Sequence, residues 1–172
     1  MSAPTLKRIL PLVGTWKGQG KGVYPGITPF EYLEEVTFST VGAKPFLTYV
    51  QKTCSVKDAT KPMHGEMGYL RAPKMTDPED EQRFELAIAQ TSGTVTIEEG
   101  YAKFDEDKGE LTLELKSSEN ILRTTSATKP YVTEFARTFI LDLNKNQLHY
   151  KLAMATKEKP LQHHLEATLV KA

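Results

Sequence analysis

Four histidines are the side chains of this sequence best suited to chemistry. His64 follows a turn marked by Pro62, and His164 follows one marked by Pro160. Each therefore begins a predicted strand and lies near a rim of the predicted barrel. His149 instead falls on the polar side of an alternating stretch, which predicts a ring that faces solvent. The fourth histidine, His163, precedes His164 directly. His64 and the His163–His164 pair are therefore the candidates for a functional site.

The placement of these histidines favours a bound iron cofactor over a bare metal site. If the chain forms ten strands, His64 begins the fourth and His164 the tenth, and in an up-and-down barrel these strands start at the same end. Neutral imidazole is a common metal ligand and the proximal ligand of many haems, and Met63 adds a thioether. A bare site would need three or more closely spaced ligands, and no HxH or HxxxH with supporting carboxylates occurs. Composition alone favours an ordinary rim histidine bonded to a loop carbonyl for His64, and one exposed and one half-buried strand residue for His163–His164.

The elements that position these residues are predicted to be antiparallel strands. After a short amphipathic segment over about residues 3–12, most of the chain alternates with a period of two, most clearly over 110–116 and 147–154. Many short strands without a long helix favour an up-and-down barrel or a sandwich. We count about ten strands, with 120–126 as the doubtful stretch. Turn residues separate them at Pro25–Gly26, Gly42–Pro45, Lys61–Pro62, Thr76–Pro78, Ser92–Gly93, Asp107–Gly109, Asn144–Asn146 and Lys159–Pro160.

A glycine-rich stretch favours the barrel over the sandwich. Glycine alternates with larger residues from Gly14 to Gly22, so that Trp16 shares one strand face with Gly18, Gly20 and Gly22. Glycines in a strand mark bends or close approach, and sheet closure uses glycine kinks. We expect this strand to plug one end of a barrel with Trp16 and to leave the lumen beyond it open. Barrels slightly larger than tightly filled ones hold one small ligand.

Length and composition limit the class of protein. The 172 residues, with 11 glycines and 10 prolines spread along the chain, fit one domain over 1–172. The 22 basic and 22 acidic residues cancel, and no basic stripe with interleaved aromatics occurs, so no nucleic-acid partner is expected. No apolar run approaches a membrane span, at the N-terminus or elsewhere, so we expect a soluble, unprocessed protein without a membrane partner.

Zero net charge favours self-association, which makes a homodimer the candidate assembly. The single Cys54 cannot form an internal disulfide, which favours the cytoplasm and a buried spare thiol.

The glycine strand also carries a family signature. Residues 14–20 read GTWKGQG and match the pattern GxWxGxG. Further matches follow in the same order over nearly the whole chain, at 24–25, 27, 29–32, 34–36, 42–45, 62–71, 89–93, 154–156 and 160–165. Together these motifs resemble the nitrobindin family of haem-binding β-barrels, whereas the opening Gly-x-Trp alone is shared with lipocalin-like carriers.

The resemblance implies an all-β protein, a ten-stranded antiparallel up-and-down β-barrel similar to fatty-acid-binding proteins and lipocalins, with a short N-terminal helix. It implies haem b with ferric iron at the mouth, and His164 as the proximal iron ligand. His64 and Met63 would lie on the distal side as catalytic residues, with Phe30 lining the pocket and Lys129 beside the porphyrin. Members bind nitric oxide and are described as peroxynitrite isomerases, which convert peroxynitrite to nitrate and spare tyrosine from nitration. The resemblance leaves two roles open for His64, donating a hydrogen bond to the ligand and filling space.

Strand parity bears on the choice between the two neighbouring histidines. On simple alternation His164 shares a face with Glu166 and Thr168, whereas His163 shares one with Leu165. A β-bulge after the preceding turn would re-aim either ring, so parity does not choose the ligand. His164 is chosen because the His-Leu pair of the family matches it.

Two further functions use the same lumen. A carrier of fatty acid or another apolar ligand would offer a buried arginine to the carboxylate, with Arg137 as the candidate and Arg123 as the second. Such a carrier would leave His64 and His164 without a role. A haem sensor or transporter that binds nitric oxide without turnover would use the same residues as the isomerase. A hydrolase is excluded because Ser92 lacks the context of a nucleophile elbow.

Overall fold

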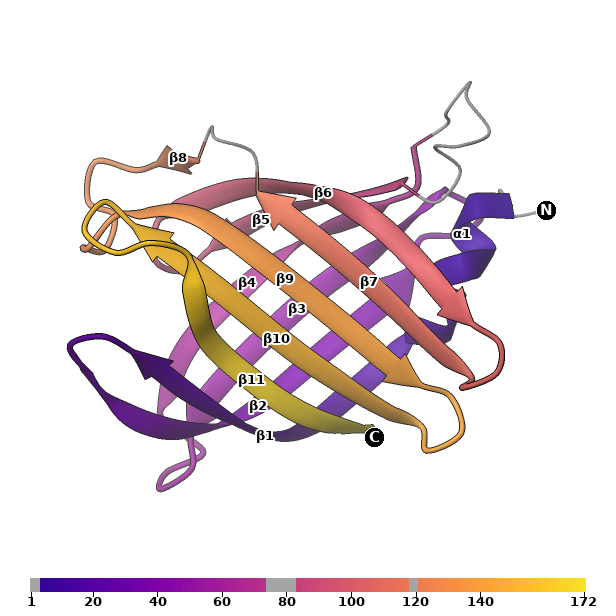
Figure 1. Ribbon diagram of the computed structural model, residues 1–172, viewed down its shortest axis with the longest axis horizontal. Helices are drawn as coiled ribbons and strands as arrows, with labels where there is room; N and C mark the ends of the chain where they lie inside the picture. The colour runs from indigo at the N-terminus through magenta and orange to yellow at the C-terminus, as the bar shows by residue number, and fades with distance from the viewer. Residues whose placement is uncertain (1–3, 74–82, 118–120) are drawn as a thin grey trace.

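The computed structural model describes residues 4–73, 83–117 and 121–172, which form a barrel with a short helical segment at one end (Figure 1). The helical segment is α1 (Pro4–Ile9) followed by one 3-10 turn (Leu10–Leu12). The long strands are β1 (Gly14–Tyr24), β2 (Ile27–Thr40), β3 (Phe46–Ser55), β4 (Pro62–Arg71), β5 (Arg83–Gln90), β6 (Thr94–Asp105), β7 (Glu110–Ser117), β9 (Val132–Asp142), β10 (Gln147–Thr156) and β11 (Gln162–Lys171).

These ten strands close into an up-and-down barrel, as the sequence predicts. Neighbours in the wall are neighbours in the chain, and every pairing is antiparallel. The wall closes where β1 pairs with β11. The two-residue β8 (Leu122–Arg123) pairs with β6 at the rim and accounts for the doubtful stretch 120–126, of which residue 120 lies outside the described residues. The predicted turn at Thr76–Pro78 also lies outside them.

The glycine strand curves as expected, but the space beside its glycines is filled. Gly20 pairs with Tyr32 and Gly22 with Phe30 across β1 and β2. A Cβ atom at either glycine would overlap the aromatic ring of its partner. The expectation of an open lumen at this face is therefore wrong. The missing side chains let two rings of β2 pack against β1, an arrangement in which an aromatic residue covers a glycine.

The apolar core fills the end of the barrel next to the helical segment. Trp16 is fully buried there, and its indole N–H donates to the carbonyl of Leu12 at 2.8 Å. Leu6 and Ile9 of α1 pack into the same cluster. Because this end is filled, the space for a ligand lies at the opposite mouth, where β11 begins (Figure 1). Among the described residues, no helix is long and apolar enough to cross a membrane.

Candidate functional site

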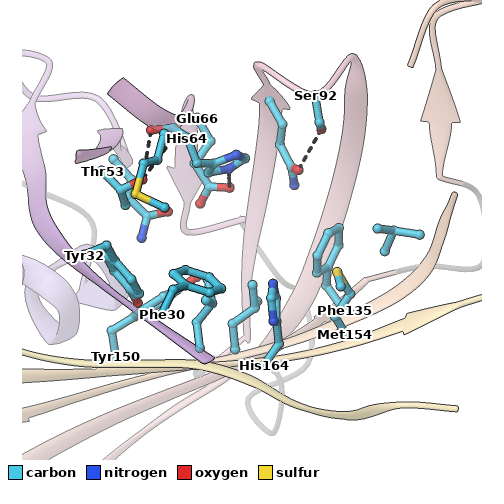
Figure 2. A pocket seen from close by; sticks show the side chains of 16 residues that line it. Phe30, Tyr32, Thr53, His64, Glu66, Ser92, Phe135, Tyr150, Met154 and His164 are labelled. Atoms are coloured by element: carbon cyan, nitrogen blue, oxygen red, sulfur yellow. Dashed lines mark hydrogen bonds and ion pairs between the residues drawn. The ribbon is translucent and has the colours of Figure 1, made fainter. Parts of the chain in front are cut away.

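A β-bulge in β11 aims His164 into the barrel. Leu152 of β10 pairs with Leu165, and the next residue, Ala153, pairs with His163, so His164 is the extra residue between them. A bulge re-aims side chains near a barrel rim. The His164 ring accordingly lines the pocket, whereas His163 is exposed (Figure 2). Simple strand alternation therefore fails at this position. It groups His164 with the outward-facing residues, but the His164 ring enters the pocket.

The surroundings of His164 leave one ring nitrogen free to bind a metal. Its Nδ1 lies 3.0 Å from the carbonyl oxygen of Val23, and a carbonyl only accepts hydrogen bonds, so Nδ1 carries the proton and Nε2 keeps its lone pair. The ring packs edge-on against Tyr24 and Phe30. Burial lowers the pKa of His164 despite the hydrogen bond to Val23, which favours the neutral ring. A neutral imidazole oriented through its second nitrogen is the arrangement found in metal-ligating histidines.

The pocket has an apolar wall and a polar wall. The pocket has a cavity volume of about 260 Å³ and opens to solvent at its mouth. The apolar wall consists of Phe30, Val132, Phe135, Leu152, Met154 and Leu165. The polar side chains that lie across the pocket from His164 in Figure 2 include Thr53, His64, Glu66 and Ser92. Gln90 also lines the pocket. A site of this kind can hold a flat, largely apolar group through one axial ligand.

The two residues expected on the distal side both line this pocket. His64 is held at two points, because its backbone N–H donates to Thr53 Oγ1 at 2.9 Å and its Nε2 lies 3.3 Å from Glu66 Oε2. Met63 is 47% exposed and lies at the mouth. The structure thus brings His64, Met63, Phe30 and His164 together, as the sequence resemblance implies.

Lys129 is the one expected site residue that does not line the pocket. It is exposed, and its Nζ lies 5.7 Å from the centre of the Tyr131 ring. Val132, one residue beyond Tyr131, does line the pocket, so Lys129 lies in the loop that leads into β9. A place beside the porphyrin stays a prediction for this residue.

A buried polar network lies beneath the pocket, and the sequence pattern does not reveal which residues form it. Arg137 is 1% exposed, and its Nε donates to Glu98 Oε2 at 2.8 Å. Its Nη1 donates to Glu66 Oε1 at 2.5 Å and to the hydroxyls of Tyr49 and Tyr150 at 3.0 Å each. Two carboxylates and two hydroxyls thus surround one guanidinium, which satisfies a charge that could not otherwise be buried.

This network argues against the lipid-carrier alternative. The carrier needs a free arginine for the fatty-acid carboxylate, and Arg137 is already paired with Glu66 and Glu98. The second candidate, Arg123, donates to the backbone carbonyls of Ile121 and Val132 and does not line the pocket. Neither arginine is available to a ligand carboxylate in the pocket.

The buried carboxylates beneath the pocket differ in their affinity for protons. Burial alone would raise the pKa of Glu66, but Arg137 and His64 outweigh it and lower that pKa to about 2. Burial raises the pKa of Glu98 even beside Arg137. Burial also raises the pKa of Glu34 to about 7, against a hydrogen bond from Gln51. Glu66 is therefore ionised at neutral pH, whereas Glu34 titrates there.

The titration of Glu34 predicts a pH dependence of stability. Because its pKa rises from 4.5 unfolded to about 7 folded, the folded state binds the proton more tightly, and this stabilisation is lost as pH rises from about 4.5 to about 7. The loss amounts to about 3 kcal/mol of unfolding free energy. Glu34→Gln keeps an acceptor for Gln51, so we expect it to match the wild type near pH 4.5 and to exceed it near pH 8 in urea unfolding. Glu35→Gln, on the neighbouring position paired with Lys17, is the control and should keep the wild-type slope.

Comparisons with known proteins agree with this geometry. A family model described as "THAP4-like, heme-binding beta-barrel domain" matches residues 5–171. The chain is 45% identical over 166 residues to peroxynitrite isomerase 2 of Mycobacterium ulcerans, and 46% identical over 167 residues to peroxynitrite isomerase 1 of Mycolicibacterium paratuberculosis. Each alignment covers 96% of this chain and 94% of the relative.

A solved structure shares the fold as well as the sequence. The crystal structure of Rv2717c from M. tuberculosis superposes with a TM-score of 0.86 at 40% identity and covers 100% of this chain and 99% of that one. The family model and the relatives both span nearly the whole chain, and the family resemblance of the sequence is confirmed. This chain belongs to the family of THAP4-like haem-binding β-barrel domains.

Proposed function

We propose that this protein is a haem-dependent peroxynitrite isomerase that converts peroxynitrite to nitrate and thereby protects tyrosine from nitration. The observation that carries the proposal is His164, a neutral imidazole whose Nδ1 donates to Val23 and whose Nε2 is free at an open, largely apolar pocket. The proteins named peroxynitrite isomerase that this chain resembles over nearly their full length support the reaction assigned to the pocket.

We propose that the pocket holds haem b. His164 would bind the iron, and the apolar wall that includes Phe135 and Leu152 would cover the ring and exclude water. Met63 and His64 would border the side on which the small ligand binds. The exposed Lys129, in the loop before β9, would attract the porphyrin carboxylates. When bound, the haem supplies an iron centre at which the peroxynitrite O–O bond breaks and nitrate forms.

The pocket also supports a ferric resting state. Its mouth is open, and both Met63 and His64 lie at the rim, so the part of the chain that the structure describes offers no enclosed distal clamp for stable dioxygen carriage. The same openness admits small ligands, and we propose that nitric oxide binds at this site as well as peroxynitrite. A ferrous dioxygen complex that persists in air would contradict the ferric assignment.

The test of the proposed function is peroxynitrite decay measured by stopped-flow absorbance, with nitrate, nitrite and nitrotyrosine quantified in the products. We expect the decay rate to rise in proportion to the haem-loaded protein, the nitrate share to increase and the nitration of added tyrosine to fall. Haem-free protein is the control and should not accelerate the decay. Equal decay rates with loaded and haem-free protein would contradict the proposal.

Two further proposals concern the setting of the reaction. We propose a cytoplasmic location, supported by Cys54, the single cysteine, which is a free and half-buried thiol.

We also propose a homodimer, supported by exposed apolar side chains on the outer faces of β4 and β6, among them Met67 at 61%, Tyr69 at 51% and Ile97 at 43% exposure. Light scattering on the purified protein measures the assembly, and a monomer at micromolar concentration would contradict the dimer.

A further inference from the structure

Glu66 joins the distal histidine to the buried network. Its Oε2 lies 3.3 Å from His64 Nε2 and accepts a longer hydrogen bond from Arg137 Nη2 at 3.4 Å. Its Oε1 accepts from Arg137 Nη1 at 2.5 Å and from the Tyr49 hydroxyl at 2.6 Å. The carboxylate is 3% exposed, whereas the His64 side chain is 36% exposed. One side of Glu66 is thus locked into the barrel interior, and the other side faces the ring that lines the pocket (Figure 2).

The state of Glu66 decides which nitrogen of His64 carries the proton. Arg137 and His64 together keep the pKa of Glu66 low against the effect of burial, so the group is an ionised carboxylate and can only accept hydrogen bonds. The nitrogen next to it must therefore be the donor. Among the described residues, His64 Nδ1 has no hydrogen-bond partner, and no competing contact selects the other tautomer.

We propose that Glu66 is a positioning residue for His64, which fixes the imidazole with Nε2–H toward the barrel interior and leaves Nδ1 for the pocket. The hydrogen bond from the His64 backbone to Thr53 Oγ1 holds the residue at a second point. The tautomer of His64 follows from the contacts within this chain. What that tautomer means for a bound ligand rests on the proposed function.

The consequence is a choice between the two roles left open for His64. A neutral ring that donates from Nε2 to Glu66 has only a lone pair at Nδ1. Neutral His64 therefore cannot donate a hydrogen bond from Nδ1 to a ligand in the pocket, and it acts by filling space and accepting. Only the protonated ring, with Glu66 compensating its charge, would offer a donor there.

The substitution Glu66→Gln makes this testable because one orientation of its amide fits the network better than the other. Two donors, Arg137 Nη1 and the Tyr49 hydroxyl, meet the Oε1 position at 2.5 and 2.6 Å, whereas Arg137 Nη2 meets Oε2 at the longer distance of 3.4 Å. We therefore expect the glutamine oxygen at the Oε1 position and its NH2 group at the Oε2 position. His64 Nε2 then faces a donor and has to accept, which moves the proton to Nδ1. The variant is thus expected to invert the tautomer rather than merely weaken the contact.

The experiment is nitrogen-15 NMR of the imidazole rings in the haem-free protein, at a pH where all histidines are neutral. We expect the Nε2–H form of His64 to exceed the other by about tenfold or more in the wild type, and the Nδ1–H form to dominate in Glu66→Gln. His164 serves as an internal reference of opposite tautomer, because its Nδ1 donates to Val23. A wild-type His64 with its proton on Nδ1 would overturn the proposal.

Glu98→Gln is the matched control. Glu98 is the other buried carboxylate paired with Arg137, and it has no contact with His64, so its loss should destabilise the barrel and leave the His64 tautomer unchanged. If Glu66→Gln and Glu98→Gln change the His64 tautomer equally, Glu66 has only a structural role, and the proposal is overturned. If Glu66→Gln fails to fold, Glu66→Asp is the second variant, because it keeps the charge but moves the carboxylate away from His64. The ratio of the Nε2–H to the Nδ1–H form of His64 should then fall, and an unchanged ratio would overturn the proposal. A failure to bind haem would refute the proposed function and leave this result intact.

Discussion

The variant His164→Ala is expected to lose tight haem binding. Removing the imidazole leaves the pocket without the neutral nitrogen that faces it, and the remaining apolar contacts would hold the porphyrin without an axial bond. Changes to residues around a metal ligand already cost 10- to 100-fold in metal affinity, so loss of the ligand itself should cost more than about 100-fold. Titration with haem, followed by the Soret absorption band, measures the affinity, and the wild type should saturate at one equivalent.

His163→Ala is the matched control for this prediction. It removes an imidazole from the adjacent position of the same strand, but that ring is exposed and outside the pocket. We expect this variant to bind haem like the wild type, and external imidazole to restore part of the axial bond in His164→Ala. A Soret band that survives in His164→Ala and disappears in His163→Ala would contradict the geometry of the bulge.

The largest expected effect on stability comes from Arg137→Leu. The substitution leaves Glu66 and Glu98 buried without their cation, and removing one partner of a buried ion pair costs about 3–5 kcal/mol. The cost should shrink in acid, because the low folded pKa of Glu66 stabilises the wild type above pH 4.5 and that contribution is lost as pH falls toward about 2. Urea unfolding at neutral and acid pH measures both quantities.

Lys103→Leu separates this effect from the loss of any positive charge. Lys103 pairs with Glu114 at 3.7 Å on the outer surface, where both side chains are more than half exposed. Exposed pairs contribute about 0–1 kcal/mol, so this variant should unfold nearly like the wild type. Similar unfolding free energies for the two variants would show that the buried network does not carry the expected energy.

The strand pattern and the barrel could be predicted from the sequence because each depends on neighbouring residues. Alternation over 110–116 and 147–154 marks one apolar face per strand, and these stretches became β7 and β10. The glycine run of β1 indicated curvature and closure. What filled the space beside Gly20 and Gly22 depends on the register with β2, which brings Tyr32 and Phe30 opposite them. Alternation along one strand carries no information on that register.

The site was predicted in part, for similar reasons. His64, Met63, Phe30 and His164 were found from the family motifs, whereas the direction of His164 depends on a bulge that shifts the pairing with β10. A single extra residue reverses every parity argument on one side of it.

The buried network shows the same limit at longer range. The position of Arg137 between apolar neighbours in an alternating strand was a usable signal of burial. Its carboxylate partners, however, stand 71 residues away at Glu66 and 39 away at Glu98. Only the closed barrel brings them together, because β5 alone separates β4 from β6 in the wall and β7 alone separates β6 from β9.

The crystal structure of the haem-loaded protein tests the central claim most directly. We expect one haem in the pocket at the mouth, with iron bonded to His164 Nε2 and the hydrogen bond from Nδ1 to Val23 retained. Iron bonded to His163 or to His64, or a haem held on the outer surface of the barrel, would contradict it.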